Sequence, residues 1–163
     1  MQQRVPLLLL ALVLVGGASP QSTSMAVGAT VIAKCTVTNP VALAFGTYDP
    51  VVANHTMLSP LDVSPNALSV SCTRGAPNVT IGLDNGLHYA NPDRYLSDGT
   101  HTLQYEIYTT SGRSTVWNST NTVSYSSSSM AASAQPVYGR IPGGQDAYVN
   151  TSYADTVIAT VNF

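Results

Sequence analysis

Charged residues are scarce in this sequence. Asp, Glu, Lys and Arg make up 9% of its 163 residues, and the formal net charge is −2. Lys34 is the only lysine, and the five arginines are scattered along the chain. A protein surface that binds nucleic acid or an anionic membrane needs clustered basic residues, so the sequence offers no electrostatic basis for either partner.

Long apolar runs are also absent, apart from one at the N-terminus. Residues 5–15 are apolar, Arg4 precedes them, and small residues follow at 16–18. This layout is typical of a secretory signal peptide, and the run is short for the alternative, a permanent membrane anchor. We expect cleavage after Ala18, with Ala26 as the second choice, and an exported mature chain without an integral membrane segment.

Recognisable catalytic and metal-binding patterns are missing. The histidines lack the close spacing to one another or to cysteine that metal sites usually show; they are His55, His88 and His101. Glu106 is the only glutamate, and Asp93 and Asp98 flank a segment where they would make turns. There is no G-x-S-x-G nucleophile motif and no phosphate-binding glycine loop. We therefore expect no enzyme, no metal and no cofactor.

Cysteine is rare too, and its even number is informative. The two cysteines are Cys35 and Cys72. In an exported chain such a pair favours a disulfide over two free thiols. The bridge would close a loop of nearly forty residues, worth roughly 3–4 kcal/mol in the chain-entropy account.

Helical periodicity is nearly absent after the signal, and short strand-like segments dominate. The segments are 25–38, 41–48, 67–73, 79–83, 103–109, 115–117, 121–125, 136–141 and 153–163. Residues 53–66 are predicted to be a polar loop, because Pro60 and Pro65 oppose regular pairing. Residues 87–101 are predicted to be mostly loop. Many short strands without crossover helices predict one all-β domain, a sandwich or a barrel.

The segment before Cys35 has a regular apolar alternation. One face carries, in order, Met25, Val27, Ala29, Val31 and Ala33. This pattern is typical of an ordinary first strand, and equally of a strand that is given to the sheet edge of a neighbour. Alternation reports a buried face and does not say which chain buries it, so both interpretations stay open.

Several segments together resemble the spore coat protein U domain family, which also contains the subunits of archaic chaperone–usher pili. They occur in the family's order and cover nearly all of the mature chain: residues 35–37 (Cys-Thr-Val), 43–50, 70–75, 103–108, 116–117, 137–142 and 153–163.

The resemblance implies an immunoglobulin-like β-sandwich that lacks its final strand. A periplasmic chaperone first fills the resulting groove, and the N-terminal strand of the next subunit then replaces it at an outer-membrane usher. By resemblance, the donor face is Met25, Val27, Ala29, Val31 and Ala33. The same resemblance implies a disulfide between Cys35 and Cys72. It places the acceptor edge and chaperone contact at Val157, Ala159, Val161 and Phe163.

These implications define the expected organisation and function. Residues 1–18 would be the signal peptide, 19–34 the donor segment and 35–163 the sandwich domain. We expect a structural subunit of a surface fibre that supports adhesion and biofilm formation, with a single domain favouring a shaft or minor subunit. Its partners would be copies of itself or related subunits, the chaperone and the usher. The alternative is a spore or cell-surface coat protein of the same fold. A third class, a carbohydrate-binding module, would need an aromatic platform from Tyr89, Tyr95 and Trp117.

Overall fold

A computed structural model describes residue 17 and residues 19–38, 41–150 and 152–163. Nearly all of the predicted signal peptide lies outside these residues. The chain divides into two units, Met1–Thr30 and Val31–Phe163. In the first unit, the described residues are exposed and form neither helix nor strand. The second unit contains all the strands that the structure describes.

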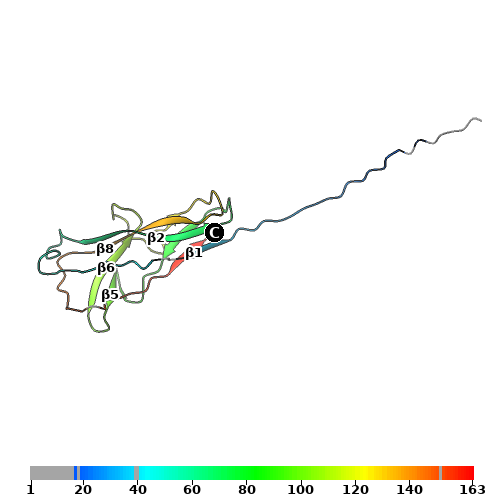
Figure 1. Ribbon diagram of the computed structural model, residues 1–163. Helices are drawn as coiled ribbons and strands as arrows, with labels where there is room; N and C mark the ends of the chain where they lie inside the picture. The colour runs from blue at the N-terminus through cyan, green and yellow to red at the C-terminus, as the bar shows by residue number, and fades with distance from the viewer. Residues whose placement is uncertain (1–16, 18, 39–40, 151) are drawn as a thin grey trace, which may run out of the picture. The chain divides into compact units, whose positions relative to one another are not determined.

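The second unit is an antiparallel β-structure of two sheets (Figure 1). Its strands are β1 (Cys35–Thr38), β2 (Leu61–Cys72), β3 (Thr80–Leu83), β4 (Tyr89–Ala90), β5 (Asp93–Ser97), β6 (Thr102–Tyr108), β7 (Val123–Ser124), β8 (Ser133–Ile141) and β9 (Ala159–Asn162). One sheet has the order β1-β2-β8-β6-β5-β4 and the other β7-β3-β9. The described residues contain no helix, so none is long and apolar enough to cross a membrane. The predicted all-β fold class is confirmed.

The core lies between the sheets and is built from the inward side chains of the central strands. Its best-buried members are Leu68, Val70, Cys72, Val79, Ile81, Leu83, Leu103, Tyr105, Ile107, Trp117, Val137 and Ile141. Trp117 is fully buried, and its indole Nε1 donates a hydrogen bond of 2.8 Å to the carbonyl oxygen of Ile81. Burying a large apolar side chain stabilises a fold by about 1.5–3 kcal/mol. These core residues therefore supply most of the hydrophobic contribution to the stability of the fold.

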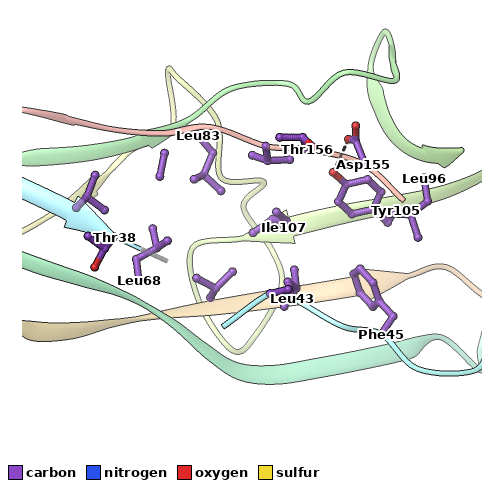
Figure 2. A pocket seen from close by; sticks show the side chains of 15 residues that line it. Thr38, Leu43, Phe45, Leu68, Leu83, Leu96, Tyr105, Ile107, Asp155 and Thr156 are labelled. Carbon is purple, nitrogen blue, oxygen red and sulfur yellow. Dashed lines mark hydrogen bonds between the residues drawn. The ribbon is translucent and has the colours of Figure 1, made fainter. Parts of the chain in front are cut away.

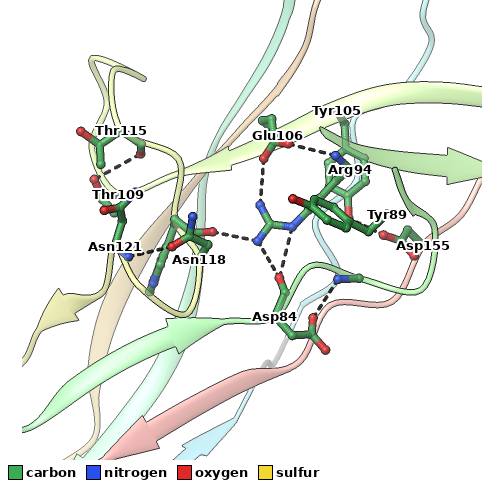
Figure 3. A network of polar contacts seen from close by, with 12 residues as sticks. Asp84, Tyr89, Arg94, Tyr105, Glu106, Thr109, Thr115, Asn118, Asn121 and Asp155 are labelled. Atoms are coloured by element: carbon green, nitrogen blue, oxygen red, sulfur yellow. Dashed lines mark hydrogen bonds and ion pairs between the residues drawn. The ribbon is translucent and has the colours of Figure 1, made fainter. Parts of the chain in front are cut away.

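A buried ion pair joins β5 to β6 (Figure 3). Arg94 Nη1 lies 2.8 Å from Glu106 Oε2, and the backbone N–H of Arg94 donates to Glu106 Oε1 at 3.0 Å. Arg94 Nη2 also donates to the carbonyl oxygens of Asp84 and Trp117. Glu106 lies on the strand face opposite Leu103, and that face is also buried at this point. The charge is tolerated there because Arg94 satisfies it.

Residues 53–66 are not wholly a loop, contrary to the prediction. β2 begins at Leu61, and its pairing with β8 runs past Pro65. The register shifts between Val63 and Asn66, so the ladder is interrupted where the proline stands. A bulge tolerates a residue that cannot donate to the ladder, and this reconciles Pro65 with a long strand.

Other segment predictions differ from the structure in ways that have a common cause. Residues 87–101, predicted to be mostly loop, contain the β4–β5 hairpin. Residues 41–48, predicted to be a strand, form none, although the inward Leu43 and Phe45 are half-buried and their neighbours exposed. Residues 25–34 form no strand either. A strand needs a ladder partner, and side-chain alternation in a sequence does not supply one.

Candidate functional site

An apolar groove of about 390 Å³ opens beside the core (Figure 2). One wall is the C-terminal segment, and the other is formed by β1 and the segment that holds Leu43 and Phe45. The lining residues are Val37, Thr38, Ala42, Leu43, Phe45, Leu68, Leu83, Leu96, Tyr105, Ile107, Val137, Asp155, Thr156, Val157 and Ala159. Strands of both sheets therefore contribute to a single cleft.

The walls belong to two sheet edges that are not joined to each other. Among the described strands, β1 pairs only with β2, and β9 pairs only with β3. β1 and β9 approach one another in space, yet no ladder links them. Each strand thus has a side without a ladder neighbour, which is the situation that favours addition of another strand.

The apolar side chains of the walls are covered only in part. Val157 and Ala159 are half-buried, whereas their neighbours Thr156, Ile158 and Thr160 are exposed. The floor is fully buried, as Leu68 and Ile107 illustrate. An extended segment that pointed alternate apolar side chains into this groove would complete the burial of both walls.

One end of the groove is polar and tightly bonded. The Asp155 side chain is 1% exposed, and its Oδ2 accepts a hydrogen bond of 2.7 Å from the Tyr105 hydroxyl. Its Oδ1 accepts from the N–H of Leu87 at 2.9 Å and lies 3.1 Å from His88 Nδ1. Burial, together with the Asp155 carboxylate, raises the pKa of Tyr105 well above its usual value. Tyr105 therefore stays protonated and remains the donor.

The turn beside Asp155 accommodates this carboxylate only because it contains a glycine. Gly86 has a φ of +78°, and a Cβ added there would collide with the Asp155 side chain. Asp84, at the start of the turn, accepts from the N–H of Ile158 at 2.9 Å and returns its own N–H to the Ile158 carbonyl. The C-terminal wall is consequently anchored to the turn at residues 84–88 without any occupant of the groove.

The opposite wall is anchored by a disulfide. Cys35 and Cys72 face each other in the β1–β2 register, and their sulfur atoms are bonded at 2.01 Å. The predicted pair is confirmed. β1 has a single ladder neighbour, β2, among the described strands. The disulfide therefore adds a covalent attachment to β2 at Cys35, the first residue of β1.

Comparison with known proteins identifies the fold family. Residues 21–160 match the Spore Coat Protein U domain. The chain belongs to this family. It is 35% identical over 130 residues to "Protein U" of Myxococcus xanthus, covering 74% of this chain and 71% of that protein. The family is described as a spore coat protein domain, so the prediction of a non-enzymatic structural protein is confirmed, and an extracellular or surface location is implied.

A solved structure supports the same fold. It is a chain from the CsuC–CsuE chaperone–tip adhesion subunit pre-assembly complex of the archaic chaperone–usher Csu pili of Acinetobacter baumannii. The TM-score is 0.54 at 22% identity, and the similarity covers 82% of this chain and 40% of that one. The present chain thus spans less than half of the solved chain. The similarity concerns the fold and confirms an immunoglobulin-like sandwich.

The acceptor residues predicted for this family member fall into two groups. Val157 and Ala159 line the groove. Val161 is half-buried against the core and does not line it, while Phe163 is 54% exposed. Sequence reasoning missed the facing wall, although the in-phase spacing of Leu43 and Phe45 carried that signal.

The predicted donor residues are fully available. Met25, Val27 and Val31 are 83%, 85% and 82% exposed, and Ala29 and Ala33 are exposed as well. Exposed large apolar side chains are candidates for contact with another surface.

The other candidate residues do not converge. His88 contacts Asp155, His101 contacts Asp98, and His55 Nδ1 lies 2.7 Å from the carbonyl oxygen of Val52. Over the described part of the chain, no three His, Cys, Asp or Glu side chains form a group that could hold a metal ion. Trp117 cannot belong to an aromatic platform, because it is fully buried in the core.

Proposed function

We propose that this protein is a structural subunit of a secreted surface fibre that assembles by donor-strand exchange, as in archaic chaperone–usher pili. The open apolar groove between β1 and the C-terminal segment carries the proposal. Residues 25–33 of one copy would enter the groove of another and add a strand between the two free edges. Main-chain hydrogen bonds would supply affinity, and the alternate side chains would complete the core.

The chemistry of the donor segment suits the groove. Burial of Met25, Val27 and Val31, with smaller contributions from the alanines, would contribute on the order of 5 kcal/mol. The main-chain hydrogen bonds of the added strand would contribute further free energy.

The mode of contact predicts a fibre. A donor segment of one copy that fills the groove of the next copy makes a head-to-tail contact that does not close on itself, and such contacts propagate. An empty groove exposes core residues and two sheet edges, which favours aggregation. A periplasmic chaperone that covers the groove before assembly would prevent this, and the solved neighbour comes from a chaperone–subunit complex. An outer-membrane usher would conduct the exchange, and the fibre would support adhesion and biofilm formation.

A coat protein of the same fold is the second candidate. The family description and the similarity to Protein U favour it. Genes for a chaperone and an usher beside this gene would favour the fibre, and a sporulating host without them would favour the coat.

The deciding experiment is the size distribution of the exported mature chain, co-expressed with a candidate chaperone and run unheated in SDS. We expect a heat-labile ladder that disappears when residues 21–33 are deleted. Val27→Asp should also abolish it, since a charge would enter the groove, whereas the matched Ala26→Asp on the other face should keep it. Stable monomers in every sample would contradict the donor-strand mechanism.

A further inference from the structure

Thr73 binds the backbone of the residues that precede β1. Its N–H donates to the carbonyl oxygen of Lys34 at 2.8 Å. Its hydroxyl oxygen lies 3.1 Å from the N–H of Lys34 and 3.1 Å from the carbonyl oxygen of Ile32. A threonine hydroxyl accepts and donates at once, so it can take the first of these bonds and give the second.

These contacts lengthen the sandwich beyond its assigned first strand. The β1–β2 register ends at the Cys35–Cys72 pair, and Thr73 adds the next pair, with Lys34. Its side chain then reaches two residues further, to Ile32. The Cys35–Cys72 disulfide holds the two strands together immediately beside these hydrogen bonds. The body of the subunit therefore begins at Ile32, although the sequence pattern continues the donor face to Ala33.

We propose that Thr73 is a positioning residue that clasps Ile32 and Lys34 to the subunit's own sandwich, so that the donor segment ends at Val31 and no flexible linker joins neighbouring subunits. This inference rests on the proposed fibre function. Ala33 then lies at the junction between two subunits and not in the neighbour's groove. A clasped junction makes the fibre stiff, because the backbone between donor and body has lost its rotational freedom.

Lys34 allows a direct test on the chaperone-bound mature chain. It is the only lysine in the sequence, so a lysine-specific endoproteinase cuts this chain only after Lys34. Cleavage requires local opening of the backbone, which the hydrogen bonds of Thr73 oppose. Thr73→Val removes the hydroxyl with little change in shape, and Thr73→Ser retains it. We expect Thr73→Val to be cut about five- to thirty-fold faster than the wild-type protein. Thr73→Ser should be cut at the wild-type rate.

A neighbouring hydroxyl provides the matched control. Ser71 lies on β2, two residues before Thr73, and its hydroxyl donates to the carbonyl oxygen of Met130 at 2.7 Å. Ser71→Ala should leave cleavage after Lys34 unchanged. The clasp is refuted if Thr73→Val is cut at the wild-type rate. It is also refuted if the free energy of unfolding in urea falls by as much as the increase in cleavage rate implies, because the faster cleavage would then reflect global unfolding.

The second readout is the shape of the fibre by negative-stain electron microscopy. Thr73→Val should keep the SDS ladder and give visibly more curved fibres, while Thr73→Ser fibres stay straight. Thr73→Val fibres as straight as the original would overturn the junction role. If the unchanged chain forms no ladder, the proposed function fails by itself, and the cleavage rates still decide whether the clasp exists.

Discussion

The hydroxyl of Tyr105 donates a hydrogen bond of 2.7 Å to the Asp155 carboxylate at the polar end of the groove. Tyr105 stands on β6, and Asp155 belongs to the C-terminal wall. This one bond ties a central strand of the larger sheet to the segment that leads into β9. The wall is thereby held in place while the rest of the groove stays open.

Removing that hydroxyl should weaken the fold in a pH-dependent way. Tyr105→Phe should lower the free energy of unfolding by about 1–3 kcal/mol near pH 7, because the carboxylate loses one donor. The pKa of Tyr105 is raised in the folded state. The stability it contributes is therefore present below pH 10 and is lost as the pH rises above the pKa of an unfolded tyrosine. Urea titrations between pH 7 and 11 should show a shallower alkaline loss in Tyr105→Phe. Equal slopes for both chains would contradict this assignment.

The groove wall offers a pair of adjacent positions with opposite orientation. Ala159 is half-buried and lines the groove, while Thr160 is exposed. Ala159→Arg should abolish the SDS ladder, since a guanidinium would occupy the space of the donor strand. Thr160→Arg should leave the ladder intact. Far-ultraviolet circular dichroism of both variants verifies folding, and a full ladder from folded Ala159→Arg would refute the groove as the site that accepts the donor strand.

The buried ion pair should matter far more than the surface one. Arg94→Met leaves the Glu106 carboxylate buried without its partner, and this should cost about 3–5 kcal/mol. Arg140 makes a bidentate contact with Asp62 at 2.7 and 2.9 Å on a partly exposed face. Arg140→Met should cost no more than about 1 kcal/mol. Urea unfolding of the mature chain compares the two, and similar losses would show that the Arg94 network is not the stabilising element we infer.

The disulfide should stabilise the subunit and its polymer together. Replacing Cys35 and Cys72 by serine should lower the free energy of unfolding by about 3–4 kcal/mol, because the unfolded chain regains the entropy of the closed loop. β1 would also lose its covalent attachment, so the ladder should melt at a lower temperature in SDS. Reducing the unchanged chain with a thiol should reproduce both effects. Unaltered melting after verified reduction would argue against a role for the bond in the groove wall.

Local patterns in the chain were enough for the fold class and for the disulfide. Short alternating segments without helical periodicity predict an all-β domain, and two cysteines in an exported chain predict one bridge. These conclusions depend on residue type and local spacing, which a linear sequence states directly. The family resemblance, and not the spacing, pointed to Val157 and Ala159, which line the groove.

Long-range pairing was decided only by the tertiary structure. Pro65 argued for a loop, yet a bulge carries β2 past it, and the burial of Glu106 depended on where Arg94 came to lie. The facing wall at Leu43 and Phe45, the polar end at Asp155 and the clasp at Thr73 join segments that are distant in sequence. Alternation along a chain says that a side chain has a buried face; only the packing of the sheets says against what it is buried.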